Sequence, residues 1–316
     1  MEVAGPEAVA LEVAGSERMM LMKKVSLIMV LVLLLTGCTV KEKANNNHGE
    51  KLIVYTSFYP MYFLTDEIGK DNIELRMVIP TGVEAHDYEP SMKQLKEIEK
   101  ADLFIYNGAG FESWADKLLE TILDEKQTIN ASEEIELIKV DKVADPHIWL
   151  NPINMNTIGE RIKEELINLD GEHKEEYEEN YQQLSDKLKK LDKEYLKTLE
   201  DKKRNTILVS HAAFAYMAER YEFDQIAVMG INPEQEPSPK TIADIIEIAK
   251  EEDFQYIFLE TLANPKTVEV IAKESGLETL TLNPIEGLTE DEENKGEDYI
   301  SIMERNLKNL KKALVD

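Results

Sequence analysis

Three of the five histidines stand at positions where a parallel α/β sheet would gather a ligand. His211 directly follows an apolar strand pattern at 206–210, and His86 lies in the loop after the pattern at 75–79. His147 lies in the proline-flanked segment DPHIWLNP. Ligands of open parallel sheets bind beyond the carboxyl ends of the strands. One such histidine would more simply be structural, but three together predict a metal site.

A carboxylate would complete a site of three neutral imidazoles, a donor set that suits zinc with four tetrahedral ligands. Glu286 is the best candidate because it lies just beyond the strand pattern that ends at Leu282. Glu84, two residues before His86, and Glu260, at the end of another strand pattern, are reserve ligands. Because the chain has 63 acidic residues, a carboxylate is chosen as a candidate ligand by its position relative to the predicted strand ends.

The neighbours of these candidates have plainer expected roles. Asp145 is placed either to orient an imidazole through its second nitrogen or to cap the turn at Pro146. Trp149, two residues after His147, is expected to pack in the core or to form a pocket wall.

The sequence after residue 50 predicts an α/β fold. Short apolar runs alternate with amphipathic helical patterns, which is typical of parallel sheets built from βαβ units. Ser91 and Gln94 form a capping box at one predicted helix start, and Ser238 followed by Pro239 marks another. The apolar runs lie at 52–55, 75–79, 103–106, 206–209, 226–228, 256–259 and 277–282.

The segment at 173–203 differs from the rest because it is rich in Glu, Lys, Tyr and Leu and contains no Gly or Pro. If it is helical throughout, its roughly 30 residues reach about 45 Å. A coiled-coil dimer is an alternative, but the apolar stripe covers fewer than three heptads. We therefore expect a monomer in which one long helix joins an N-terminal lobe at 51–172 to a C-terminal lobe at 204–316. His173, at the polar start of this helix, is expected to be exposed.

The N-terminal residues 1–37 are predicted to be an extension followed by a secretory signal peptide. Lys23 and Lys24 precede an apolar run of 11 residues at 25–35, whereas a membrane span needs about 20. A basic start, a short apolar core and small residues before a cleavage site describe such a signal.

The sole cysteine, Cys38, ends the sequence LTGC, which resembles a bacterial lipobox. This resemblance implies that Cys38 carries diacylglycerol through a thioether and becomes the mature N-terminus. An ordinary buried thiol is the alternative. Residues 38–50 are polar without an apolar period, and we expect a flexible tether in which His48 is solvated.

The composition excludes several classes of protein. With 63 acidic and 36 basic side chains the net charge is −27, which argues against a nucleic-acid partner. One cysteine cannot form an intrachain disulfide framework or a Cys-rich zinc or iron–sulfur site.

Nearly all of the chain after Cys38 resembles the metal-binding subunit of bacterial zinc and manganese ABC importers, solute-binding protein family 9 (cluster A-I). The motifs are highly specific only when taken together. They are GVEAHDYEPS at 82–91, NGAGFESW at 107–114, DPHIWLNP at 145–152, SHAAFAYMAERY at 210–221, PEQEPSP at 233–239 and LNPIEGLT at 282–289.

The resemblance implies two Rossmann-like lobes with parallel sheets, joined by one long rigid helix, with a metal in the cleft between them. The first lobe would supply His86 and His147 as ligands, and the second lobe His211 and Glu286. Manganese-binding relatives have a carboxylate at the position of His211, so this set favours zinc over manganese. The chain departs from many zinc-binding relatives because residues 87–146 contain no histidine, so nothing supports a zinc-collecting loop.

The resemblance also implies a function in metal import. The chain would be an extracytoplasmic lipoprotein, held on the outer face of the bacterial cell membrane through Cys38. It would capture Zn²⁺ with high affinity and deliver it to a membrane permease coupled to a cytoplasmic ATPase.

Binding rather than turnover is expected, because a site with four protein ligands presents no activated water, whereas a catalytic zinc keeps an open position. Three alternatives remain at this stage. The chain could be a manganese-specific importer subunit, an exported zinc hydrolase with Glu286 or Glu84 as general base, or a surface adhesin.

Overall fold

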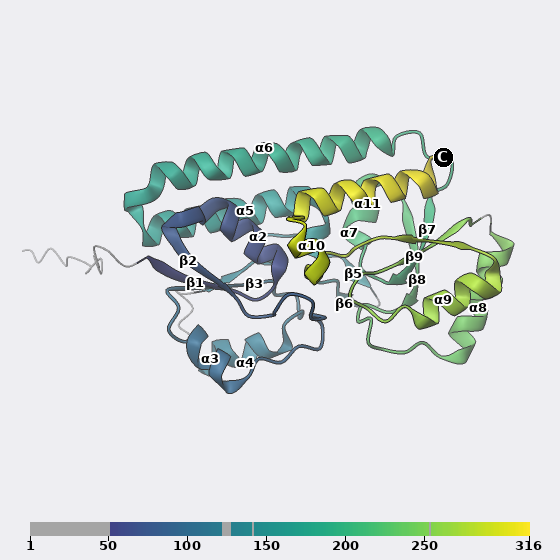
Figure 1. Cartoon of the computed structure of the whole chain (residues 1–316), viewed down its shortest axis with the longest axis horizontal. Helices are drawn as coiled ribbons and strands as arrows, with labels where there is room; N and C mark the ends of the chain where they lie inside the picture. The colour runs from purple at the N-terminus through teal and green to yellow at the C-terminus, as the bar shows by residue number, and fades with distance from the viewer. Residues whose placement is uncertain (1–50, 122–127, 141, 253) are drawn as a thin grey trace, which may run out of the picture. The chain divides into compact units, whose positions relative to one another are not determined.

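The structure is a computed structural model that describes residues 51–121, 128–140, 142–252 and 254–316 (Figure 1). The predicted signal peptide, the lipidation site at Cys38 and the tether with His48 lie outside the described residues. No helix in the described ranges combines the length and the apolar character that a membrane span requires.

The first lobe is built on a parallel sheet with the strand order β2-β1-β3-β4. Its strands are β1 (Leu52–Thr56), β2 (Ile73–Met77), β3 (Leu103–Tyr106) and β4 (Thr128–Asn130). β3 is buried along its whole length, as a central strand covered on both faces should be. Its other elements are α2 (Tyr59–Gly69), η1 (Lys70–Asn72), α3 (Met92–Ile98), α4 (Ser113–Thr121), an antiparallel hairpin of β5 (Lys139–Val140) and β6 (Val143–Ala144), η3 (Ile148–Leu150) and α5 (Pro152–Leu169).

The second lobe repeats this plan with the strand order β10-β9-β7-β8, again parallel. Its strands are β7 (Thr206–His211), β8 (Asp224–Met229), β9 (Tyr256–Leu259) and β10 (Glu278–Thr281). Its helices are α7 (Ala215–Tyr221), α8 (Pro239–Glu251), α9 (Lys266–Ser275), α10 (Glu290–Asn294) and α11 (Tyr299–Leu314).

One long helix, α6 (Lys174–Thr198), lies along both lobes after a short turn, η4 (Gly171–His173). Figure 1 shows α6 above α5 in its first part and above α11 in its last part. Asn180 donates a hydrogen bond to the Ile68 carbonyl in the first lobe, and the Tyr195 hydroxyl donates to the Met303 carbonyl of α11. The helix therefore contacts both lobes.

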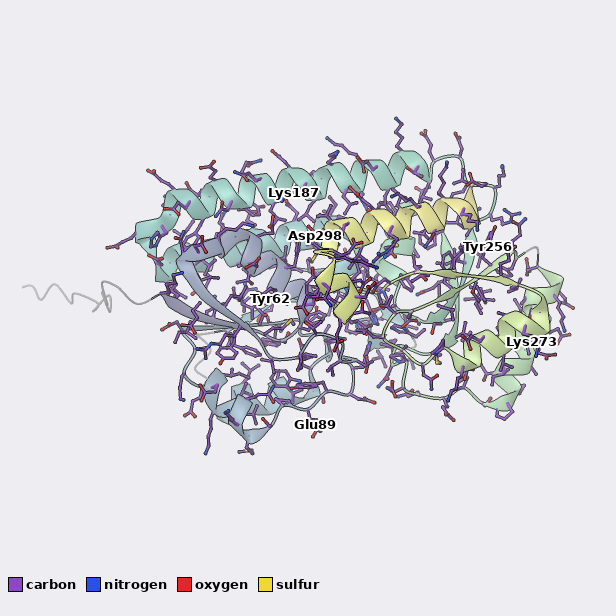
Figure 2. The ribbon with its side chains drawn as sticks, viewed as in Figure 1. Tyr62, Glu89, Lys187, Tyr256, Lys273 and Asp298 are labelled. Atoms are coloured by element: carbon purple, nitrogen blue, oxygen red, sulfur yellow. The ribbon has the colours of Figure 1, made fainter. Side chains whose placement is uncertain are left out.

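The apolar stripe of α6 packs within this chain. Tyr177, Leu184, Leu188 and Tyr195 are fully buried, so they are not free to form the seam of a coiled coil. Figure 2 labels Lys187 on α6, and its ammonium group pairs with Glu67 of α2 at 2.7 Å. His173, expected to be exposed, is partly exposed and lies 2.6 Å from Asp170 through Nδ1.

The α/β fold class with two parallel-sheet lobes and a long helix is confirmed. The capping box of Ser91 and Gln94 is present, and Ser238 caps α8 with Pro239 at its first position. β4 and the β5–β6 hairpin were not expected from the sequence. Their strands have two or three residues each, too few for an alternating pattern to be recognised.

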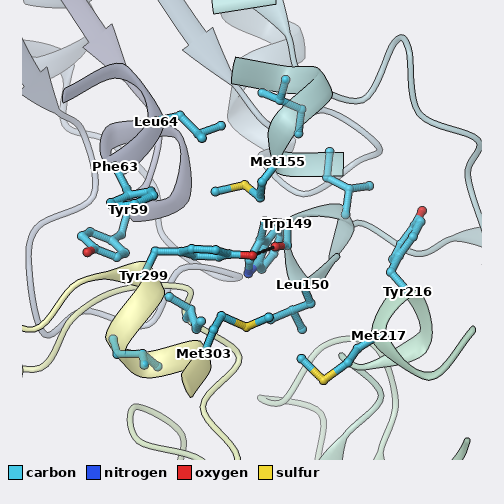
Figure 3. Packing of buried hydrophobic residues seen from close by; sticks show 14 of the residues in the cluster. Tyr59, Phe63, Leu64, Trp149, Leu150, Met155, Tyr216, Met217, Tyr299 and Met303 are labelled. Atoms are coloured by element: carbon cyan, nitrogen blue, oxygen red, sulfur yellow. Dashed lines mark hydrogen bonds between the residues drawn. The ribbon is translucent and has the colours of Figure 1, made fainter. Parts of the chain in front are cut away.

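A continuous hydrophobic cluster extends from the first lobe into the second. Trp149, Tyr299 and Met303 lie side by side in it, together with Met155 from α5 (Figure 3). The contact of these side chains means that the two lobes share part of their core.

Candidate metal centre

Four side chains from separate segments converge between the two sheets. His86 comes from the loop between β2 and α3, and His147 directly precedes η3. His211 is the last residue of β7, and Glu286 lies in the loop between β10 and α10. His86, His211 and Glu286 lie beyond the carboxyl ends of parallel strands, where ligands of such sheets bind, whereas His147 follows the antiparallel β5–β6 hairpin.

Among the residues that the structure describes, these four form a group that could hold a metal ion, with ligand atoms all within 4.8 Å of one another. The Nε2 atom of His147 lies 3.3 Å from that of His86 and 3.2 Å from that of His211. Glu286 Oε1 lies 3.2, 3.6 and 3.4 Å from the Nε2 atoms of His86, His147 and His211.

These separations match a tetrahedral zinc site. A tetrahedron with centre-to-corner distances of about 2.0–2.1 Å has edges of about 3.3–3.4 Å. Five of the six separations between ligand atoms fall on either side of that value, and the remaining pair, His86 and His211, has its ligand atoms within 4.8 Å of each other. The side chains are 6% exposed or less, so water has little access to the centre of the group.

Two carboxylates on the outer side of the group hold two of the imidazoles. Asp145 Oδ1 lies 2.7 Å from His147 Nδ1 and accepts a hydrogen bond from the backbone N–H of His147. Glu260 Oε1 lies 2.6 Å from His211 Nδ1 and likewise accepts from the backbone N–H of His211. A carboxylate on Nδ1 fixes the ring and leaves the lone pair of Nε2 directed at the metal position.

The convergence of lone pairs requires a cation. With Nδ1 of His147 and of His211 donating to carboxylates, both Nε2 atoms present lone pairs 3.2 Å apart. Two such acceptors facing each other in a buried site repel unless a proton or a metal ion lies between them.

In the metal-free group, the pKa values of the imidazoles and of Glu286 are shifted by burial and by the charges that face one another. Burial lowers the pKa of His211, but the carboxylates of Glu260 and Glu286 outweigh this effect and raise it to about 10. Burial raises the pKa of Glu286, but the three imidazoles lower it well below its usual range. Burial lowers the pKa of His86, which has weaker carboxylate support. In the absence of metal, a proton on His211 therefore compensates the Glu286 charge.

The reserve residues take other positions. Glu260 is on the Nδ1 side of His211, and Glu84 accepts a hydrogen bond from the backbone N–H of His86. Burial, followed by the nearby Glu286 charge, raises the pKa of Glu84 to about 7. Asp145, for which the sequence left two alternatives open, makes the contacts of both: its Oδ1 lies 2.7 Å from His147 Nδ1 and accepts a hydrogen bond from the His147 N–H across the turn at Pro146.

Residues that the sequence did not single out support the same ligands. Phe111 packs edge-on against the His86 ring at a centroid distance of 4.9 Å. The side chain of Asn107 donates to the carbonyl of Pro146, directly before His147. Glu112, buried and with its pKa raised to about 7 by burial, accepts from the backbone N–H groups of Asn107 and Gly108. These three belong to the NGAGFESW motif, whose place in the family resemblance was the available signal.

The fold and this buried group define a bilobed solute-binding protein with a site suited to one metal ion. The model of the family "Zinc-uptake complex component A periplasmic" matches residues 54–313. The chain therefore belongs to this family, which is a family of transport proteins and not of enzymes.

Named relatives agree with this membership. The chain is 36% identical over 311 residues to the zinc-binding lipoprotein AdcA of Streptococcus pneumoniae (strain ATCC BAA-255 / R6), covering 92% of this chain and 61% of AdcA. It is 35% identical over 286 residues to the high-affinity zinc uptake system protein ZnuA of Bacillus subtilis, covering 85% of this chain and 90% of ZnuA. The chain thus spans about three fifths of the length of AdcA but nearly all of ZnuA.

The fold is also that of solved relatives. The crystal structure of the Zn(II)-bound ZnuA-like domain of Streptococcus pneumoniae AdcA superimposes with a TM-score of 0.76 at 37% identity. The match covers 84% of this chain and 100% of that domain.

Proposed function

We propose that this protein captures Zn²⁺ outside the cytoplasm with high affinity and delivers it to a membrane permease of the ABC type. The observation that carries the proposal is the convergence of His86, His147, His211 and Glu286, with five of the six separations between ligand atoms at 3.2–3.6 Å and the sixth within 4.8 Å. The zinc-binding names of the relatives support the same cargo.

The donor set supports zinc rather than manganese as the cargo. Three imidazole nitrogens and one carboxylate oxygen suit zinc, whereas manganese prefers more oxygen ligands and octahedral geometry. The burial of all four side chains leaves little room for the water ligands that would complete an octahedron. Zinc bound in this way has no open position, so the site holds its metal and does not activate water.

Capture and delivery would depend on both lobes, because each lobe supplies two of the four ligands. His86 and His147 belong to the first lobe at 51–172, and His211 and Glu286 to the second at 204–316, with the segment at 173–203 between them. Zinc binding draws the lobes together, because a ligand stabilises the form that binds it. The permease would accept this closed form and separate its ligands, with ATP hydrolysed by the cytoplasmic subunit.

The membrane attachment is also part of the proposal. Cys38 would carry the lipid, and residues 38–50 would let the binding protein reach the permease while it remains at the outer face of the cell membrane. The word lipoprotein in the name of AdcA supports this location.

Metal analysis of the purified protein tests the proposal. We expect one zinc per chain, tighter binding of zinc than of manganese in competition titrations, and loss of tight zinc in His211→Ala. His173→Ala is the matched control, because this histidine pairs with Asp170 away from the group. A wild-type protein that binds no zinc, or that prefers manganese, would overturn the proposal.

A further inference from the structure

The backbone that presents Glu286 is strained. Ile285, the residue before it, has φ +59° and is fully buried. A β-branched residue in the left-handed region is an outlier that persists only where its surroundings hold it. The position of the Glu286 carboxylate therefore depends on what holds the segment Asn283–Ile285.

The second lobe holds the start of this segment. Asn283 Oδ1 accepts a hydrogen bond from the backbone N–H of Ile285 at 2.7 Å. Asn306 on α11 accepts from the backbone N–H of Asn283 and donates to its carbonyl. These bonds fix Asn283, but none of them contacts Pro284.

Within the described part of the chain, one side-chain hydrogen bond from the first lobe reaches Pro284. The indole Nε1 of Trp149 donates a hydrogen bond of 2.6 Å to the Pro284 carbonyl. Trp149 is fully buried and is only two residues from His147. Its own carbonyl accepts a hydrogen bond of 2.7 Å from the Tyr299 hydroxyl, drawn as the dashed line in Figure 3.

The ring of Trp149 has little freedom to move. Its ring packs against Phe58 and Phe111 at centroid distances of 4.8 and 5.2 Å, and against the His147 ring at 5.2 Å. The indole therefore connects the segment that carries one ligand of the first lobe to the segment that carries the carboxylate ligand. A second bond from the first lobe, Gly82 N–H to the Leu288 carbonyl, lies beyond Glu286 and involves backbone only.

We propose that Trp149 is a positioning residue for zinc retention: its indole N–H holds the strained segment before Glu286 against the first lobe. This inference rests on the proposed zinc-binding function. When the lobes separate, loss of this bond frees Pro284 and Ile285 to relax, and the Glu286 carboxylate withdraws from the three imidazoles. The bond between Trp149 and Pro284 thereby couples lobe opening to zinc release.

The test is the rate at which zinc leaves the protein into an excess of chelator. Trp149→Phe keeps an aromatic ring but removes the N–H donor, and we expect zinc dissociation to become roughly three- to tenfold faster, as the loss of one hydrogen bond would give. Trp114→Phe is the matched control, since Trp114 is the only other tryptophan and packs on Phe104 in a separate cluster. Its dissociation rate should equal that of the wild type.

A double variant separates positioning from packing. If Trp149 acts through Glu286, Trp149→Phe should leave the dissociation rate unchanged in a Glu286→Ala background. The same fold-change in both backgrounds would overturn the inference. Tyr299→Phe, which removes only the hydroxyl that supports Trp149, should also accelerate dissociation, and it provides the test if Trp149→Phe fails to fold. If the wild type binds zinc normally and both single variants release zinc at the wild-type rate, the inference is refuted and the proposed function stands. A wild type that binds no zinc would refute the proposed function.

Discussion

Glu260 Oε1 lies 2.6 Å from Nδ1 of His211 and also accepts a hydrogen bond from the backbone N–H of the same residue. Glu260 directly follows β9, the strand that pairs with β7, at whose end His211 stands. The register of these two neighbouring strands thus places the Glu260 carboxylate against the Nδ1 side of the His211 imidazole. Since both side chains are 3% exposed or less, solvent cannot replace this contact.

Removal of Glu260 should weaken zinc binding without removing a ligand. Glu260→Ala is expected to lower zinc affinity roughly 10- to 100-fold, the range typical of residues that support a metal-bound histidine. Glu260→Gln should lose less zinc affinity than Glu260→Ala, because its amide oxygen can still accept the hydrogen bond. Competition with a chromophoric chelator measures both. Glu247→Ala, an exposed residue on α8, is the control, and equal affinity of all three variants would contradict this role.

Zinc binding at neutral pH should release at least one proton. The pKa of His211 is about 10 in the metal-free protein against an ordinary value of 6.5, because the Glu260 and Glu286 carboxylates outweigh burial. At pH 7 His211 therefore carries a proton that zinc must displace, and affinity should fall as pH falls. Calorimetry in buffers with different ionisation enthalpies counts these protons. The Glu260→Gln variant should release fewer protons when it binds zinc. A wild type that releases no protons on zinc binding would refute this account.

The same shift makes the stability of the metal-free protein depend on pH. The pKa of folded His211 is raised above that of the unfolded chain, so its stabilising contribution is complete below about pH 6.5 and is lost as pH rises to about 10. We expect the midpoint of thermal unfolding of the metal-free protein to fall across this range. His211→Ala should lose this part of the pH dependence.

The positions of the histidines could be predicted because strand ends can be recognised in the sequence. Apolar runs mark β7 and β2, and the parallel topology of each sheet places His211 and His86 beyond the carboxyl ends of these strands, one in each lobe. The choice of Glu286 among 63 acidic residues required its place beyond a strand pattern and the resemblance of its motif. The structure brings these residues together with His147 as the prediction required, and their role as ligands remains a proposal.

The contact of Glu260 with His211 could not be predicted because it depends on which strands are neighbours. Glu260 is 49 residues from His211 in sequence, and only the pairing of β7 with β9 brings it to the Nδ1 atom. The left-handed conformation of Ile285 also leaves no sequence signal, since it contradicts the preference of a β-branched residue. Short-range patterns thus identified the elements, and long-range register determined how the His211 imidazole is held.

The turn at Gly108 should be sensitive to a single methyl group. Gly108 has φ +76°, and a Cβ there would overlap the amide oxygen of Asn130 and the Ser132 hydroxyl. Gly108→Ala is expected to lower the free energy of unfolding by about 2–4 kcal/mol, since it adds this overlap to the cost of a left-handed alanine. Gly110 has φ +80° with no atom within 4 Å of its Cβ position, so Gly110→Ala should cost only about 1–2 kcal/mol. Urea unfolding of the two variants compares them, and equal losses would show that the overlap is relieved.

The attachment of α6 to the second lobe should depend on a bidentate ion pair. Arg220 on α7 donates through Nε and Nη2 to the two carboxylate oxygens of Asp192 at 2.9 and 2.8 Å. Asp192 is 5% exposed, so Arg220→Met leaves a nearly buried carboxylate with the hydroxyl of Tyr221 as a hydrogen-bond donor.

Because Arg220 itself is 36% exposed and screened by water, we expect a loss of about 1–2 kcal/mol rather than the 3–5 kcal/mol of a fully buried pair. Lys190→Met is the matched control, since Lys190 pairs with Glu194 on the solvent side of the same helix and should change stability by less than about 0.5 kcal/mol. Zinc affinity should stay unchanged in both variants, because neither residue contacts the ligand group. A large loss of affinity in Arg220→Met alone would instead indicate that the fit of α6 against the second lobe also sets the geometry of the metal site.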